Sequence, residues 1–324
     1  MTLARDEERR RTRVLVPGGA GFIGRHAVAA LFDAGADVVV GTRRPGPLGR
    51  RRPPHALAAD APMREIHMDR LTSAKDWLPL IDDVDAVLNC VGILRQRGHE
   101  TYARVHHEAP EALAAACREG GKRFVHVSAL GLDEPARSRF LTSKLAGEQA
   151  VRRVGGDWIL ARPSLLDGVG GFGASWLRGI ARLPVFVAPA DAQGRIAALD
   201  VGELGEALAR LALGADAELG LHESRVFELG GTEAWRFKDY ILALRRTYTD
   251  APALCVPIPG FLARLAAHVC DLLHFTPFSF GHWELLRRDN VPRVNRLPEL
   301  LGREPVSVVA RRPDQTASLR DPNS

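Results

Sequence analysis

The stretch that most constrains the fold is VLVPGGAGFIGRH, residues 14–26, where a β-branched run leads directly into spaced glycines. Gly18, Gly21 and Gly24 stand after a predicted strand and across the start of a predicted helix. Glycine is needed in such a turn because the chain bends sharply, a phosphate approaches the backbone, and the helix packs closely on its strand. A glycine triplet alone is weak evidence, but its place between strand and helix predicts a dinucleotide site.

The helix that follows the glycines should complete the phosphate site. Phe22 and Ile23 lie in its first turn, where backbone N–H groups are free and the helix dipole is positive. We therefore expect these two residues to bind the pyrophosphate. Arg25, just after the third glycine, could add a second phosphate contact.

The end of the second predicted strand, VVVGTRRPG, selects the cofactor. It lacks the Asp or Glu that would receive the adenosine ribose hydroxyls of NAD, and Arg43 and Arg44 stand there instead. Because guanidinium groups suit a 2′-phosphate, we expect NADP(H) to be preferred over NAD(H). The alternative is that the two arginines belong to a basic surface loop. Asp69, after the third strand, is a candidate acceptor for the adenine edge or an exposed loop residue.

Short β-branched runs alternate with helical stretches from residue 13 to about 162, the pattern of a parallel sheet covered by helices on both faces. The fold class expected is α/β, a Rossmann-type doubly wound parallel sheet with a smaller C-terminal substrate or cap lobe. The expected parts are a basic tail (1–12), an NAD(P)-binding domain (13–163), a cap lobe with returning Rossmann elements (164–304) and a polar tail (305–324). Strands are predicted at 13–17, 37–41, 64–68, 85–91, 123–128 and 157–163, and helices at 22–34, 103–119 and 141–154.

Composition excludes several classes of function. The net charge of +5 comes without an aromatic platform or a recognition-helix pattern, so we do not expect nucleic acid binding. The four cysteines have neither CxxC pairing nor His at zinc-ligand spacing, so no metal site is predicted. No run of apolar residues is long enough for a transmembrane segment, which favours a cytoplasmic protein. A position at the inner face of the membrane stays open.

Residues 259–286 form the most apolar and aromatic part of the chain. We expect a buried cap helix here. The alternative is a docking face for a membrane surface or a protein partner. The segment SLLDGVGGFG, after Pro163, is predicted to be a flexible turn, and the Pro-, Gly- and Arg-rich segment 43–55 an exposed loop.

The motifs together resemble the extended short-chain dehydrogenases/reductases. The landmarks are the GxxGxxG turn, NCVG, VHVSALG, FLTSK and LARPSLLDG. More narrowly, VSALG, FELGG and LLRRDNV are similar to an atypical branch that includes the nucleotide-binding accessory subunit of respiratory complex I, its bacterial relatives and proteins linked to quinone biosynthesis. The resemblance implies cofactor contacts from Val91, Gly92, Ser128 and Pro163. It also implies a respiratory or quinone-biosynthesis assembly at the membrane surface as a partner.

The chain departs from that family at the catalytic positions. Catalytic members use Ser, Tyr, Lys and Asn, and matching by position places Leu130 at the Ser, Phe140 at the Tyr and His106 at the Asn. Only Lys144 survives, one helical turn after Phe140. Ser128 is interpreted as a structural or nicotinamide-facing hydroxyl.

A substitute acid would have to come from another residue. Thr142 points elsewhere on its helix, whereas Tyr102 and His106 share one helical face. His106 could act as a general acid, although a structural histidine is the favoured interpretation.

Two main functions follow from these departures. The first is an NADP(H)-binding scaffold or accessory factor with a degraded catalytic tetrad. The second is an NADPH-dependent reductase or an epimerase/dehydratase-like enzyme that uses a substitute acid. A binder of nucleic acid or membrane through its Arg clusters ranks below both.

Overall fold

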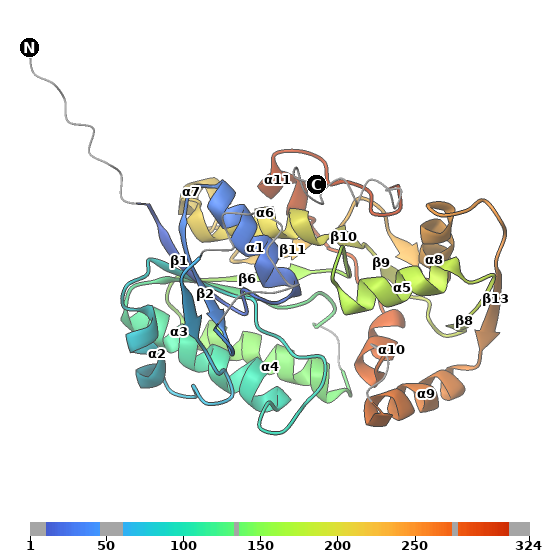
Figure 1. Ribbon diagram of the computed structural model, residues 1–324, viewed down its shortest axis with the longest axis horizontal. Coiled ribbons are helices and arrows are strands. Elements are labelled where there is room, and N and C mark those ends of the chain that lie inside the picture. The colour runs from blue at the N-terminus through green and yellow to red at the C-terminus, as the bar shows by residue number, and fades with distance from the viewer. Residues whose placement is uncertain (1–10, 46–60, 133–135, 274–277, 311–324) are drawn as a thin grey trace, which may run out of the picture.

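A computed structural model describes residues 11–45, 61–132, 136–273 and 278–310, and all structural statements concern these ranges. Figure 1 shows a large lobe built on a central sheet and a smaller lobe beside it, formed by segments after residue 163. The sequence expectations for the loop 46–55 and for most of both tails lie outside the described residues.

The central sheet has seven strands in the order β11-β6-β5-β4-β1-β2-β3, and every pair in it is parallel. The chain winds outward from β1 in one direction and from β4 in the other, so the carboxyl ends of β1 and β4 flank the crevice where dinucleotides bind in such sheets. The strands are β1 (Arg13–Pro17), β2 (Asp37–Thr42), β3 (Met63–Glu65), β4 (Ala86–Asn89), β5 (Arg123–Val127), β6 (Trp158–Pro163) and β11 (Val226–Leu229).

Helices cover both faces of this sheet because its strands are apolar on both sides. Val14 and Val16 pack into the core beneath α1 (Phe22–Asp33), α6 (Val201–Leu213) and α11 (Leu297–Leu301). Leu15, between them, packs into the opposite core with α2 (Ala74–Ile81) and α3 (Ala109–Glu119). A π-helix, η3 (Ala103–Glu108), precedes α3, and α4 (Arg139–Val154) lies on the same face (Figure 1).

The smaller lobe contains short strands and four of the longer helices. Its main core joins α5 to α8 through Leu177, Tyr240 and Leu244. The elements are α5 (Phe172–Arg182), α8 (Phe237–Arg246), α9 (Gly260–Leu273), α10 (Phe280–Leu286), β7 (Leu166–Asp167), β8 (Val185–Pro189), β9 (Arg195–Ile196), β10 (Leu199–Asp200), β12 (Trp235–Arg236) and β13 (Leu254–Ile258). The short α7 (Asp216–Leu219) belongs to the large lobe and lies by the central sheet (Figure 1).

The predicted fold class is confirmed, and several local expectations are corrected. The third strand ends at Glu65 instead of residue 68, and the predicted helix 103–119 begins as the π-helix η3. The helix α2 was not predicted at all. Within 259–286 the expectation of a buried helix holds for α10, but it is wrong for α9, where Phe261 is 71% exposed.

Candidate functional site: a dinucleotide cleft with an altered proton relay

The glycine turn has the close packing that the sequence predicted. Gly18 has a φ of +78°, which favours glycine, and a Cβ at Gly24 would overlap the carbonyl oxygen of Gly18. The Arg25 N–H donates to the carbonyl of Gly21 at 3.1 Å. The N–H groups of Phe22 and Ile23 precede this bond at the start of α1, where a phosphate would accept from them.

A second glycine-rich segment, residues 168–171, crosses from the smaller lobe onto α1. A Cβ at Gly170 would overlap the Arg25 guanidinium, and a Cβ at Gly171 would lie 2.6 Å from Cζ of Phe22. Arg25 also donates to the carbonyl of Val169. The predicted flexible turn is therefore packed against the nucleotide helix, and Arg25 binds this turn in the structure.

The end of β2 places the two predicted arginines at the surface. Arg43 forms an ion pair with Glu100, and the Arg44 N–H lies 3.5 Å from Thr42 Oγ1. Glu100 was not identified from the sequence, because it lies 57 residues from Arg43 in a separate loop. Asp69 lies half-buried in the turn after β3.

The loop after β4 brings Val91 and Gly92 to the centre of the cleft. Asn89 Oδ1 accepts from the Val91 N–H at 3.1 Å and fixes the loop. A Cβ at Gly92 would lie 3.9 Å from Lys144 Nζ, so this lysine of α4 reaches the loop. Burial lowers the pKa of Lys144 to about 8, and the carboxylate of Glu148 opposes that shift.

Ser128 and Pro163 lie at the carboxyl ends of β5 and β6, beside this loop. Both side chains are buried, and Ser128 Oγ has no hydrogen-bond partner among the described residues. A buried hydroxyl without a partner is costly, so its donor and acceptor are available to a bound group. This unpartnered hydroxyl and the glycine turn fit a dinucleotide that runs from α1 to Lys144.

Aromatic rings occupy the place of the family's catalytic phenol. Phe140 lies edge-on to Tyr102 and His106, with ring centroids 5.9 and 5.6 Å away, and stacks on His282 at 6.0 Å. Lys144 Nζ lies 5.9 Å from the centre of the Phe140 ring. Phe140 and Lys144 therefore share one face of α4, as their spacing predicted. Leu130, at the family's Ser position, is a buried apolar side chain.

His106 is held at both ring nitrogens. Its Nε2 accepts from the Ile93 N–H at 3.1 Å, and its Nδ1 lies 2.9 Å from Ser143 Oγ, which itself donates to the Phe140 carbonyl. The ring is thus neutral with the proton on Nδ1. Burial lowers the pKa of His106 to about 2, and the charge of Lys144 acts in the same direction. Tyr102 stacks on His106, which confirms their shared face.

The helix α10 covers Phe140 from the smaller lobe, a contact that sequence reasoning missed. The buried carboxylate of Glu284 accepts from the N–H groups of Arg137 and Ser138 at 2.9 and 2.8 Å, just before α4 begins. Two residues earlier in α10, His282 stacks on Phe140, and its Nδ1 lies 2.6 Å from Ser279 Oγ. Burial lowers the pKa of His282 to about 4, and Arg95 acts in the same direction.

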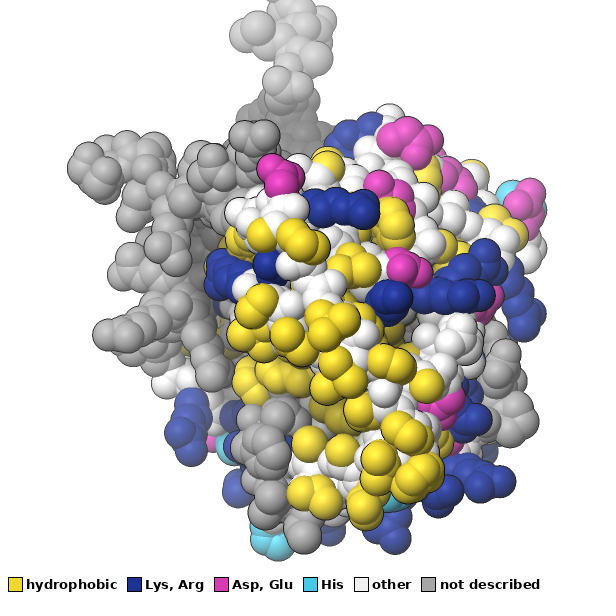
Figure 2. Space-filling view, turned by 90° about the vertical axis from the view of Figure 1, so that its right-hand side faces the viewer, with side chains coloured by type: hydrophobic (Ala, Val, Ile, Leu, Met, Phe, Trp, Pro, Cys, Tyr) yellow, Lys and Arg dark blue, Asp and Glu magenta, His cyan; other side chains and the backbone are white. Residues whose placement is uncertain are grey.

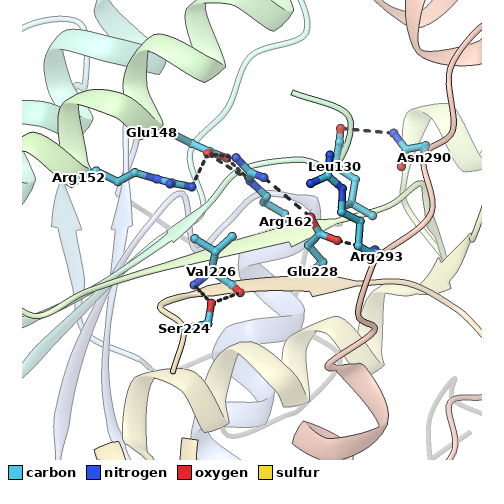
Figure 3. Close-up of polar contacts among 9 residues, drawn as sticks. All are labelled: Leu130, Glu148, Arg152, Arg162, Ser224, Val226, Glu228, Asn290 and Arg293. Atoms are coloured by element: carbon cyan, nitrogen blue, oxygen red, sulfur yellow. Dashed lines mark hydrogen bonds and ion pairs between the residues drawn. The ribbon is translucent and has the colours of Figure 1, made fainter. Parts of the chain in front are cut away.

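Residues from three of the sequence landmarks make two separate sets of polar contacts (Figure 3). Arg162, from LARPSLLDG, donates through Nε to the buried Glu148 of α4 at 2.9 Å. Arg162 also lies 3.9 Å from Glu228, from FELGG, and Glu228 accepts from the Arg293 N–H at 2.6 Å. From LLRRDNV, Asn290 contacts the Leu130 carbonyl at 3.4 Å. These motifs therefore hold α4, β6, β11 and the C-terminal segment together.

Among the described residues, no group of three or more His, Cys, Asp or Glu side chains is arranged to hold a metal ion. Within the same ranges, no helix has both the length and the apolar character needed to cross a membrane.

Known proteins match this chain mainly in its first half. The model of the NAD dependent epimerase/dehydratase family matches residues 14–173. A ceramide reductase of Caulobacter vibrioides is 33% identical over 157 residues, which are 48% of this chain and 47% of that protein. The mitochondrial NADH dehydrogenase (ubiquinone) 1 alpha subcomplex subunit 9 of Rattus norvegicus is 29% identical over 163 residues, 47% of this chain and 40% of that protein. The chain thus spans less than half the length of either relative.

Solved structures share the fold over almost the whole chain. An NADPH-dependent quinone oxidoreductase of Escherichia coli superimposes with a TM-score of 0.68 and 15% identity, covering 95% of this chain and 100% of that one. The UDP-N-acetylglucosamine 4-epimerase of Bacillus cereus gives a TM-score of 0.63 at 16% identity, covering 95% and 96%. At such identities these likenesses establish the fold alone.

The fold, the glycine turn and the cleft define an NAD(P)-binding protein of the extended short-chain dehydrogenase/reductase type, which confirms the resemblance inferred from the motifs. Through residues 14–173 the chain belongs to the NAD dependent epimerase/dehydratase family, as an atypical member in which Phe140 replaces the catalytic tyrosine.

Proposed function

We propose that this chain is an NADP(H)-binding scaffold or accessory factor linked to respiratory or quinone metabolism. The observation that carries the proposal is the contrast around Lys144. The phosphate end of the cleft keeps its glycines, whereas Phe140 fills the place of the phenol and His106 is held at both ring nitrogens. Such a site binds a nucleotide without the family's proton relay.

Each end of the nucleotide would meet a different kind of group. The N–H groups of Phe22 and Ile23 would bind the pyrophosphate, Lys144 would donate to the nicotinamide ribose, and the Ser128 hydroxyl would face the nicotinamide. NADPH, when bound, supplies a hydride. In the scaffold function that hydride has no proton donor beside it, and the nucleotide serves to stabilise the cleft.

Preference for NADP(H) rests on Arg43 and Arg44 at the end of β2. In the structure Glu100 pairs with Arg43, so a 2′-phosphate would compete with this carboxylate for the guanidinium. Charge-assisted contacts of this kind change affinity by about tenfold or more.

Calorimetric titration of NADPH and NADH tests the preference. Wild type should bind NADPH more tightly, Arg43→Asp should lose that advantage, and Arg246→Asp, on the exposed side of α8, should keep it. Equal affinities in wild type would overturn the cofactor proposal.

The link to respiratory or quinone metabolism is supported by the similarity to the complex I subunit, which covers 40% of that protein. The tagged chain, purified from its host, should migrate on a native gel with subunits of such an assembly. A chain that migrates alone would remove this part of the proposal.

A second candidate function is an NADPH-dependent reductase in which Lys144 is the proton donor. Its pKa of about 8 is in the range of an efficient general acid, and its Nζ lies 5.9 Å from the centre of the Phe140 ring. A substrate carbonyl carbon would take the hydride, and its oxygen would take the proton from Nζ. Lys144 would then recover a proton from water.

The pH dependence of NADPH oxidation in the presence of decanal separates the two functions. A lysine acid must be protonated, so the rate should fall as pH rises through about 8, and Lys144→Met should abolish it. The scaffold function predicts no substrate-dependent oxidation at any pH.

A further inference from the structure

The helix α9 has its apolar face directed away from the protein. Among the α9 side chains that the structure describes, only the small Ala263 and Ala267 are fully buried. Leu262, Leu265 and Val269 follow helical spacing on the outer side, and Leu265 is 60% exposed. Amphipathic helices normally direct such a stripe into a core, so this reversed orientation calls for an apolar surface outside the molecule.

The neighbouring strands β8 and β13 extend this surface. They pair in parallel, with Leu254 opposite Val185 and Val256 opposite Val187. All four side chains are exposed, while the alternate residue Phe186 faces the core. Both cross-strand pairs on the outer side are therefore apolar, and β13 leads directly into α9.

Together the outer sides of β8, β13 and α9 form a continuous apolar area, here named the α9 face. Figure 2 shows it as a broad field of apolar side chains with Lys and Arg side chains at its border. Isolated exposed apolar residues are common, but a contiguous field with a charged border marks a binding surface.

The charges on the elements that form the α9 face indicate its occupant. Arg182, at the end of α5 just before β8, and Arg264, on α9, are exposed cations, and Asp250, just before β13, is an exposed acid. The acid of α9, Asp271, is paired with Arg95 at 2.9 Å and accepts from the Phe280 N–H. An apolar centre with cations beside it complements a bilayer surface, which offers acyl chains to the former and phosphates to the latter.

We propose that the α9 face docks the protein on a membrane surface that contains anionic phospholipid. The proposal does not depend on whether the cleft catalyses a reaction. Docking would also position the cleft, because His268 of α9 stacks on Phe280 of α10 at 4.7 Å and the same α10 covers Phe140. The nicotinamide end of the cleft would then be one helix away from the lipid.

The test is co-sedimentation of the full chain with vesicles of phosphatidylcholine, with and without phosphatidylglycerol. Wild type should bind the vesicles that contain phosphatidylglycerol. Leu265→Asp should weaken this binding by about tenfold or more, since it removes a leucine that the bilayer would bury and adds a charge of the wrong sign. Val294→Asp is the matched control, because Val294 is 66% exposed but outside the α9 face, and it should bind like wild type.

Three further measurements make the outcome decisive. Arg182→Gln and Arg264→Gln should each weaken binding by about fivefold, and only where phosphatidylglycerol is present. Thermal unfolding of each variant shows whether it is folded. Absence of vesicle binding by folded wild type would overturn the proposal, as would equal losses for Leu265→Asp and Val294→Asp. A wild-type dimer in light scattering that Leu265→Asp dissociates, without vesicle binding, would assign the face to a second copy of the chain.

Discussion

The two ends of the nucleotide cleft are formed by different kinds of chemical groups. At the phosphate end, glycines and backbone N–H groups shape the site, and a Cβ at Gly24 would overlap the backbone of Gly18. At the nicotinamide end, the rings of Tyr102 and His282 pack on Phe140, and the centre of the Phe140 ring lies 5.9 Å from Nζ of Lys144. The first end has the family's glycine turn, whereas the second has Phe140 at the position that the sequence match gives to the family's catalytic tyrosine.

The difference teaches that nucleotide binding and proton transfer depend on separable groups in this fold. Backbone geometry binds phosphate, and it is preserved by glycine at a few positions. Proton transfer depends on one side-chain oxygen, so a single replacement such as Phe140 removes it while the rest of α4 is unchanged. Lys144 belongs to both functions, because it can bind a ribose and supply a proton.

The largest expected effect is on the free energy of unfolding, and it concerns the buried ion pair next to Lys144. Glu148→Ala leaves the buried Arg162 without its close carboxylate and should destabilise the fold by about 3–5 kcal/mol, measured by urea unfolding. Glu299→Ala, which breaks the exposed pair with Arg296, should cost about 1 kcal/mol or less. Equal losses in the two variants would show that the buried network is not what holds the lysine end.

The next effect should be confined to the phosphate end. Gly21→Val should abolish NADPH binding, because its side chain would fill the space that the pyrophosphate needs. Gly21 has a φ of −80° and a ψ of −178°, which valine accepts, but a Cβ there would lie 3.0 Å from the carbonyl oxygen of Gly18, so thermal unfolding is measured to show that the variant is folded. Gly179→Val, at a position of α5 with open space around it, is the control and should bind normally. NADPH fluorescence titration that finds affinity in Gly21→Val would place the nucleotide elsewhere.

A smaller effect is expected at the lysine itself. Lys144→Ala should weaken NADPH binding by about 1.5–3 kcal/mol, the value of a hydrogen bond from a charged group. Lys75→Ala, on the exposed side of α2, should leave the affinity unchanged. If calorimetry finds the same affinity in both variants, Lys144 does not contribute to NADPH binding. The affinity would then come from the phosphate end alone.

Features that depend on neighbours in sequence were predictable. The glycine turn, the strand runs and the shared face of Phe140 and Lys144 all follow from residues a few positions apart. The helix α2 was missed for a local reason, because Pro79 lies inside its eight residues and obscures the helical pattern.

Features that depend on tertiary contacts were not predictable. Glu284 binds the start of α4 from 146 residues away in the sequence, and no local sequence pattern predicts that contact. The three landmark motifs were recognised separately, but the contacts of Arg162 with Glu228 and of Asn290 with the Leu130 carbonyl appear only in the folded chain. The outward orientation of α9 is of the same kind, since an apolar stripe has the same sequence pattern whether it faces a core or a membrane.

The most direct test of the central claim compares wild type with Phe140→Tyr for two properties, NADPH affinity by calorimetry and NADPH oxidation with decanal. The account predicts equal affinities, because the added hydroxyl lies at the end of the cleft that moves protons. It predicts oxidation only in Phe140→Tyr, or faster there by roughly 10² to 10⁴, the usual contribution of a general acid. Rapid oxidation by wild type that Phe140→Tyr does not improve would contradict the account and show that another group already supplies the proton.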